Sequence, residues 1–174
     1  MCPFPFFGKA KHSTPRWVDR LRQFLPESAI LTDPADRWSY GYDNSREHVI
    51  PDAVVFPANA GDVQTCVQLC NELALPVLAR GRGTGTAGAA VPVRGGLVLA
   101  MERMNRILAV DPANRVMVVE PGVTNQAVQD AAAVHGFFGP PIQPAPPFVR
   151  WVGTSHAILL GHTQSNTVLP VTIP

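Results

Sequence analysis

A glycine-rich segment from Pro76 to Pro92 constrains this chain more than any other feature. It starts as an apolar run and continues as Arg80-Gly81-Arg82-Gly83-Thr84-Gly85-Thr86-Ala87-Gly88. Glycine lets the backbone adopt positive φ and lets a ligand approach the main chain closely. Successive exposed N–H groups in such a loop form a concave anion site, and two arginines add positive charge. The segment therefore predicts a loop that binds the diphosphate of a nucleotide cofactor.

The run from Gly83 to Gly88 matches the pattern G-x-G-x-x-G, but its surroundings do not fit a Rossmann unit. There the third glycine lies in the opening turns of a helix, whereas here Pro92, Gly95 and Gly96 follow and exclude a long helix. A Lys-Ser or Lys-Thr pair is also missing after the loop, so it is not a P-loop. Two alternatives stay open: a glycine-rich turn between strands, or a diphosphate loop without a long following helix.

Length and composition limit the classes of protein. The chain has 174 residues, of which 46% are hydrophobic, enough for one core or for one domain and part of a second. The net charge of +1 does not favour a nucleic-acid partner. The sequence contains no apolar run of the ~18–20 residues that cross a membrane, and the start from Met1 to Lys11 lacks the pattern of a secretory signal. We expect a cytoplasmic protein, with membrane-peripheral association possible only for the complete protein.

The three cysteines, Cys2, Cys66 and Cys70, do not form a disulfide framework because their number is odd in a chain of ordinary size. Cys66 and Cys70 are four residues apart in an expected helix and so face the same side. Two soft metal ligands are conceivable, but no Cys or His cluster completes the site. We therefore predict buried free thiols and no metal.

The middle of the chain alternates strand and helix patterns. Apolar runs bounded by proline or glycine predict strands over Ala53–Phe56, Pro76–Ala79 and Leu97–Ala100. Apolar residues at helical spacing predict a helix over Val63–Leu73, opened by Gly61-Asp62. A strand, a helix and a strand at this spacing form a βαβ unit, so we expect a sheet that begins parallel.

A hairpin and a second helix follow. The hairpin is predicted from Ile107–Val110 and Val116–Glu120. After a break, a helix runs to His135 and is capped by Thr124 or Asn125.

The N-terminal part, residues 1–50, carries weaker signals. Trp17–Leu25 predicts a short amphipathic helix with Trp17, Leu21, Phe24 and Leu25 on one face. Asp33–Pro51 is polar and predicts an irregular loop whose aromatic residues pack against the core.

Several of these segments, in this order, resemble the PCMH-type FAD-binding domain of the vanillyl-alcohol oxidase superfamily. The resemblance covers about Leu21 to Phe138 and is greatest for the glycolate oxidase FAD subunit and the D-lactate dehydrogenases. The segments that carry it are Pro51–Pro57, Asp62-Val63, Pro76-Val77, Arg80–Gly85, Gly95–Leu99 and Val119–Val123.

The resemblance implies an α+β fold of two subdomains with FAD between them. This chain would hold the βαβ-containing first subdomain and an incomplete second one, with the FAD-binding part at residues 51–138. Main-chain N–H groups of Arg80 to Thr86 would surround the FAD diphosphate, and Pro121 and Gly122 would lie close to the cofactor. The side chains of Arg80 and Arg82 either contact the cofactor or are solvated loop charges. Structural roles are expected for Asp43, His48 and His135.

The resemblance ends after Phe138, and the tail, residues 139–174, is rich in proline. Family members of this type continue with Trp-Pro-Pro-Asp-Pro, Gly-Gly-Asn and Lys-Tyr-Gly. Codons from Gly139 onward, read one base out of register, permit this continuation, and the glycine encoded across Trp151 and Val152 is forced because tryptophan has one codon. We therefore expect an out-of-frame tail, in which His156 and His162 are not ligands. The alternative is a genuine Pro-rich tail.

These observations predict the N-terminal FAD-binding fragment of an FAD-linked dehydrogenase or oxidase of a 2-hydroxy acid, D-lactate or glycolate. The substrate would bind only to the complete protein, and no residue of this chain is assigned as catalytic. We expect the chain as written to bind FAD weakly or not at all, because half of the cofactor site is absent. The alternative is a non-catalytic nucleotide-binding or interaction module.

Overall fold

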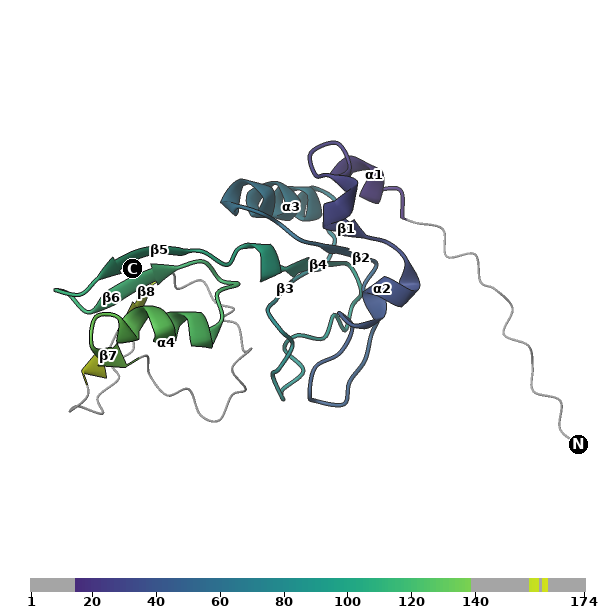
Figure 1. Ribbon diagram of the computed structural model, residues 1–174. Helices are drawn as coiled ribbons and strands as arrows, with labels where there is room; N and C mark the ends of the chain where they lie inside the picture. Colours follow the sequence, from purple (N-terminus) through teal and green to yellow (C-terminus); the bar gives the residue numbers. More distant parts are fainter. Residues whose placement is uncertain (1–14, 139–156, 160, 163–174) are drawn as a thin grey trace, which may run out of the picture.

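The fold is centred on a four-stranded sheet with the order β1-β2-β4-β3. The computed structural model describes residues 15–138, 157–159 and 161–162 (Figure 1). β2 (Ala53–Val55), β4 (Leu97–Ala100) and β3 (Val77–Arg80) are parallel neighbours, and β1 (Ile30–Leu31) pairs antiparallel with β2. The predicted parallel sheet is thus confirmed, with an antiparallel strand at one edge.

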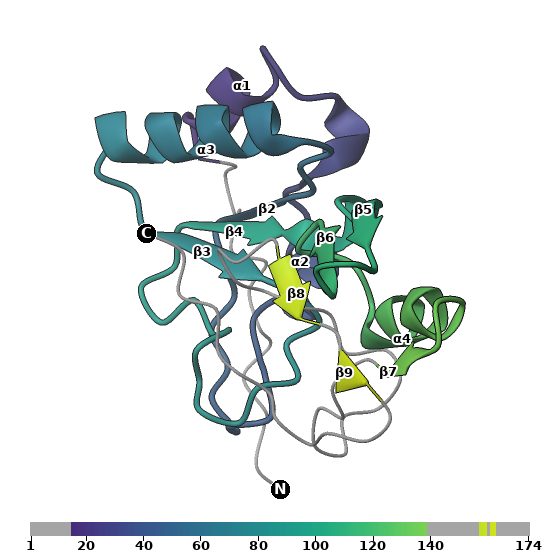
Figure 2. The ribbon, with the colours of Figure 1, turned by 90° about the vertical axis from the view of Figure 1, so that its left-hand side faces the viewer.

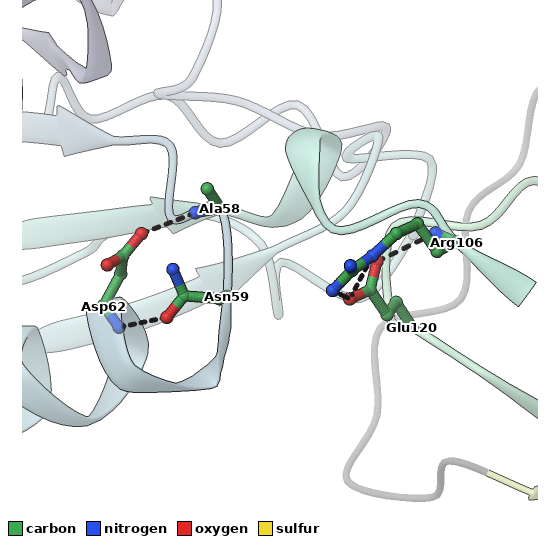
Figure 3. Close-up of polar contacts among 5 residues, drawn as sticks. All are labelled: Ala58, Asn59, Asp62, Arg106 and Glu120. Carbon is green, nitrogen blue, oxygen red and sulfur yellow. Dashed lines mark hydrogen bonds and ion pairs between the residues drawn. The ribbon is translucent and has the colours of Figure 1, made fainter. Parts of the chain in front are cut away.

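The helix of the βαβ unit, α3, spans Ala60–Glu72 and begins three residues before the predicted start. The side chain of Asn59 accepts a hydrogen bond from the N–H of Asp62 (3.0 Å), and the Asp62 carboxylate accepts one from the N–H of Ala58 (2.8 Å) (Figure 3). These two bonds satisfy N–H groups that a helix start leaves without a partner. They explain why the helix can include Gly61 instead of starting after it.

Both faces of the sheet are buried, which suits a central strand such as β4 that is apolar at every position. α1 and α3 cover one face, as Figures 1 and 2 show. The core on that face joins side chains from the N-terminal segment, the sheet and α3: Val18, Leu21, Leu25, Val55, Cys66, Leu69, Cys70, Leu97 and Leu99. The opposite face buries Val54, Val98 and Ala100 against Leu31, Tyr40, Phe56 and Leu78.

Two predictions for the N-terminal part are wrong. The helix expected over Trp17–Leu25 is the single turn α1 (Val18–Leu21), and Phe24 is 39% exposed because tighter turns follow and rotate it away from the core. The stretch expected to be irregular contains α2 (Pro34–Trp38), where Asp33 accepts a hydrogen bond from the N–H of Ala35. Proline in the first helical turn, after an aspartate cap, favours this short helix.

The second unit consists of β5 (Ile107–Asp111), β6 (Val116–Val119) and α4 (Asn125–Ala133). β5 and β6 form the predicted antiparallel hairpin, and the Thr124 hydroxyl caps α4 by accepting from the N–H of Ala127 (3.2 Å). One core cluster joins them through Met117, Val119, Val123, Val128 and Ala132. A short 3-10 turn, η2 (Met101–Arg103), connects β4 to this unit.

Parts of the tail also pair with this unit. β8 (Ala157–Leu159) runs antiparallel to β6, and β9 (Gly161–His162) runs antiparallel to β7 (Phe137–Phe138). The rest of the tail, with its clustered prolines, lies outside the described residues, as do Cys2 and the start of the chain.

Candidate functional site: a glycine loop at the carboxyl edge of the sheet

The glycine-rich loop, residues 81–88, leaves the sheet at the carboxyl end of β3. Arg80, the last residue of β3, lies opposite Ala100, the last residue of β4, and the two strands are parallel. The loop and η2 therefore begin side by side at one edge of the sheet. Open parallel sheets bind ligands outside the carboxyl ends of their strands. The predicted diphosphate loop lies in the position that this rule favours.

The backbone of the loop is shaped by glycines that take positive φ. Gly83 has φ +66° and Gly88 has φ +76°. A side chain at Gly83 would also collide with the guanidinium group of Arg80. Only glycine adopts this conformation without strain, so Gly83 is required by both its φ and its surroundings. Gly81 is buried where the loop leaves the strand.

Five successive N–H groups of the loop have no partner within the described part of the chain. Those of Gly83, Thr84, Gly85, Thr86 and Ala87 donate no hydrogen bond to any described residue. Gly83 and Thr84 are half-buried, whereas Gly85, Thr86 and Ala87 are exposed. Backbone N–H groups are strong donors that seek a partner in protein, water or ligand. Five successive donors without an acceptor in the described residues are available to an anion, as the prediction of a diphosphate loop requires.

The carbonyl groups of the same loop, in contrast, are bound to a second loop. The N–H of Asn44 donates to the Gly85 carbonyl (2.9 Å), and the Asn44 side-chain amide donates to the Thr84 carbonyl (3.2 Å). In Figures 1 and 2 the indigo loop that carries Asn44 and the teal glycine loop lie side by side below the sheet. The carbonyl side of the glycine loop is thus bound to the neighbouring loop, and the N–H donors lie on the opposite side.

The side chain of Arg80 is 4% exposed, and its hydrogen bonds are made to backbone carbonyls of the protein. Its guanidinium group donates to the carbonyls of Tyr42 (2.7 Å), Ala90 (3.0 Å) and Ser39 (3.1 Å). It also lies over the ring of Tyr40, at 5.8 Å from the centroid. Burial lowers the pKa of this guanidinium, and the nearby Asp43 opposes that effect. Arg80 therefore fastens both ends of the glycine loop to the neighbouring loop, a role that neither sequence alternative included.

Asp43 and Asn44 complete this arrangement and were not among the predicted site residues. Asp43 is buried and accepts hydrogen bonds from the N–H groups of Ser45 (2.8 Å) and Ala90 (3.4 Å). Hydrogen bonding with Ser45 holds the pKa of Asp43 below its ordinary value, against the opposing effect of burial. The sequence Asp-Asn-Ser indicates a turn. It carries no signal for a partner forty residues further along the chain.

The other predicted site residues lie in two different settings. The side chain of Arg82 is exposed, as is that of Thr86, whereas Thr84 is half-buried. Gly122 is buried, and its N–H donates to the Met104 carbonyl (2.7 Å). A side chain at Gly122 would collide with the carbonyl oxygens of Met101 and Met104. This N–H is therefore used for packing against η2 and is not available to a ligand.

The strand end before Gly122 is held by an ion pair (Figure 3). The buried carboxylate of Glu120 accepts from the Arg106 guanidinium (2.6 Å) and from the Arg106 N–H (2.8 Å). Hydrogen bonds from Arg106 hold the pKa of Glu120 below its ordinary value. Pro121 is half-buried beside this pair. Gly122 packs against η2, and η2 continues directly from the carboxyl end of β4. Pro121 and Gly122 therefore lie at the same edge of the sheet as the glycine loop.

The remaining titratable candidates have structural settings. The ring of His48 contacts that of Trp38 in a tilted arrangement, with centroids 4.0 Å apart, and His135 is exposed after the end of α4. Cys66 and Cys70 are buried free thiols, as predicted, and burial raises the pKa of Cys66 to about 12. Among the described residues, no group of three or more His, Cys, Asp or Glu side chains could hold a metal ion. No helix in the described part is long and apolar enough to cross a membrane.

The fold is an α+β domain with a glycine-rich loop at the carboxyl edge of a parallel sheet, and comparisons with known proteins identify its family. A model of the FAD binding domain matches residues 51–168. A D-lactate dehydrogenase of Archaeoglobus fulgidus is 38% identical over 130 residues, which cover 72% of this chain and 28% of the relative. Glycolate oxidase subunit GlcD of Bacillus subtilis is 37% identical over 108 residues, covering 62% of this chain and 23% of the relative.

A solved structure agrees with these relatives. p-Cresol methylhydroxylase with bound substrate superimposes with a TM-score of 0.62 at 28% identity, over 72% of this chain and 26% of that chain. This chain belongs to the FAD binding domain family, and FAD is the cofactor of that family. It spans 23–28% of the length of the relatives described above.

The described residues fit this cofactor. Unpartnered N–H groups of Gly83 to Ala87 are suited to the oxygens of a diphosphate, and the glycines leave the main chain open to close approach. The two arginines differ in their setting, since the side chain of Arg80 is buried and that of Arg82 is exposed.

Proposed function

We propose that this chain is the FAD-binding part of an FAD-linked dehydrogenase or oxidase that acts on a small 2-hydroxy acid. The relatives named above act on D-lactate or glycolate, which are both 2-hydroxy carboxylates. When bound, FAD accepts the hydride from the alcohol carbon of such a substrate. The observation that carries the proposal is the row of unpartnered N–H groups at the carboxyl edge of a parallel sheet.

In this proposal the main chain from Gly83 to Thr86 binds the diphosphate. The exposed side chain of Arg82 adds positive charge beside it. Arg80, Gly81 and Gly122 hold the shape of the site, because each is buried in the protein. Pro121 forms the adjoining wall. No described residue is assigned to hydride or proton transfer.

The test is an FAD titration of the full chain followed by NMR of the backbone amides. Thr86→Glu places a carboxylate at an exposed position of the cradle, where it repels a diphosphate without disturbing the core. We expect FAD affinity to fall about tenfold or more, since a like charge within a few Å costs about 1–3 kcal/mol. Gln68→Glu, on the exposed side of α3, adds the same charge away from the loop and serves as the control.

Two results would contradict the proposal. One is a set of loop amides that do not shift at millimolar FAD in the unmodified chain. The other is an equal loss of affinity in Thr86→Glu and Gln68→Glu, because it would place binding outside the loop. The incomplete cofactor site allows weak binding at most, and the proposed role of the loop requires that some binding remains. Stoichiometric flavin absorbance in the purified protein would overturn the expectation of weak binding.

We also propose that residues 139–174 are out of frame. The support is the continuation that the shifted codons permit, and the match of the FAD binding domain model as far as residue 168 stands against it. Sequencing the gene across the codons for Phe137 to Gly139 decides the question. An additional T there would restore the expected continuation, whereas the present sequence would make the tail genuine.

A further inference from the structure

We propose that Asn44 is a positioning residue for the diphosphate loop, and that it aims the loop's donors by holding the loop's carbonyl groups. The inference rests on the proposed function of that loop. It adds a residue outside the glycine-rich segment, on a stretch of chain where no role in the cofactor site had been assigned. The observation is the pair of hydrogen bonds from Asn44 to the carbonyls of Thr84 and Gly85.

The geometry of the peptide bond gives these two contacts their consequence. In a planar trans peptide the C=O of one residue and the N–H of the next point in opposite directions. The Thr84 carbonyl shares its peptide with the N–H of Gly85, and the Gly85 carbonyl shares its peptide with the N–H of Thr86. When Asn44 binds both carbonyls, both N–H groups must point away from it. Asn44 therefore turns two adjacent donors toward the open side of the loop.

Asn44 can do this because its own loop is fastened on either side. Tyr42 accepts a hydrogen bond from Arg80 through its carbonyl (2.7 Å), and Asp43 binds the N–H groups of Ser45 and Ala90. Arg80 and Ala90 lie on either side of the glycine loop along the chain. The same two loops are thus joined at both ends of the cradle, and Asn44 joins them in the middle.

A purely structural role explains the Asn44 side chain poorly. It is exposed and fills no part of the core, and the only partner of its amide in the described chain is the Thr84 carbonyl. A hydrogen bond of this kind contributes little to global stability when both groups can bind water instead. We expect the bond to affect the direction and order of the loop instead. Without it, the protein would stay folded but the loop would be less ordered.

The test compares Asn44→Ala with Asn114→Ala in the full chain. Asn114 also donates a side-chain hydrogen bond, to Asp111 (2.7 Å), but in the exposed turn between β5 and β6. We measure backbone ¹⁵N order parameters at Gly85 and Thr86 without ligand, and FAD affinity by amide shift titration. Asn44→Ala removes only the side-chain bond to the Thr84 carbonyl, so it should lower the order parameter of the Gly85 N–H from about 0.85 to below about 0.6. The Thr86 N–H, whose peptide keeps its bond to the backbone N–H of residue 44, should change less. It should also weaken FAD binding about threefold to tenfold, the worth of one hydrogen bond.

Asn114→Ala should leave both quantities at the values of the unmodified chain. Unchanged order parameters in Asn44→Ala would overturn the proposal, and so would a loss of order that leaves FAD affinity unchanged. If the unmodified chain shows no FAD-dependent shifts, the proposed function fails. The order parameters, which need no ligand, then still decide whether Asn44 orders the loop.

Discussion

Two glycine-containing turns lie at the same edge of the sheet, and they use glycine in opposite ways. In the glycine loop the N–H groups of Gly83 to Ala87 have no partner in the described chain, while the carbonyls of Thr84 and Gly85 are bound. At Gly122 the N–H is bound to the Met104 carbonyl, and the missing side chain allows contact with the backbone of η2. The first turn leaves donors open, and the second closes a joint between two units of the fold.

The comparison shows that a glycine in a family motif does not by itself identify a ligand contact. The family resemblance predicts that both turns lie near FAD. Hydrogen-bond accounting separates them, because a donor already bound inside the protein cannot also bind a phosphate oxygen at no cost. We therefore expect changes at Gly122 to act on stability and changes in the glycine loop to act on binding.

The largest effect is expected for Gly122→Ala. The new methyl group would collide with two carbonyl oxygens of the backbone, which cannot move aside as a flexible side chain can. We expect the free energy of unfolding to fall by about 3 kcal/mol, at the upper end of overpacking effects. Urea denaturation followed by circular dichroism measures it. A loss below about 1 kcal/mol would show that Gly122 does not form a tight joint.

The next effect is expected for Arg80→Met, which keeps much of the apolar stem but removes the guanidinium group. Three carbonyls, of Ser39, Tyr42 and Ala90, would lose their charged donor. We expect a destabilisation of about 2 kcal/mol, with the two loops released from each other. Amide hydrogen exchange should rise in both loops and stay unchanged in α4. Exchange that rises across the whole chain would contradict a local role.

A smaller, pH-dependent effect is expected for Glu120→Gln. Arg106 lowers the pKa of Glu120 in the folded state below its ordinary value of 4.5. The stability that the pair contributes is therefore present above pH 4.5 and is lost as the pH falls through the lower pKa of the folded protein. Since the partner Arg106 is largely exposed, we expect less than about 1 kcal/mol.

The measurement is urea denaturation between pH 3 and 7 in the unmodified chain and in Glu120→Gln. The difference between the two proteins should shrink as the pH falls below 4.5. If the difference in unfolding free energy between the two proteins is constant over this range, the ionised pair does not stabilise the turn at Gly122.

The smallest effect on stability is expected for Gly85→Ala. A side chain there would meet only the Asp43 carboxylate, at an ordinary contact distance of 3.9 Å, and Gly85 does not have positive φ. We expect a change within about 0.5 kcal/mol. Set against Gly122→Ala, this variant sharpens the comparison, since the same chemical change is made in both turns. A loss of unfolding free energy as large as that of Gly122→Ala would show that the two turns do not differ in how tightly they are packed.

The sequence predicted best what depends on neighbours in the chain. The hairpin of β5 and β6 and the Thr124 cap of α4 follow from local patterns and were found nearly at their true bounds. The predicted start of α3 was too late because the helix is capped by Asn59, four residues before the apolar pattern begins at Val63.

Contacts between distant segments could not be predicted in this way. The bonds from Asn44 to the glycine loop join residues forty positions apart, and no periodicity encodes them. The sequence likewise gave no sign that Arg80 would be buried, because an arginine beside glycines has the same local pattern whether it faces a ligand or the protein. The presence of the glycine loop could be predicted from the sequence. Which of its N–H and C=O groups are bound within the protein could not.

Amide hydrogen exchange, read residue by residue with and without FAD, tests the central claim most directly. The account predicts fast exchange at Gly83 to Ala87 and slow exchange at Gly122 in the free chain. Added FAD should shift or protect the loop amides and leave Gly122 unchanged. Protection of the loop amides in the free chain, or a response to FAD at Gly122 but not in the loop, would contradict it.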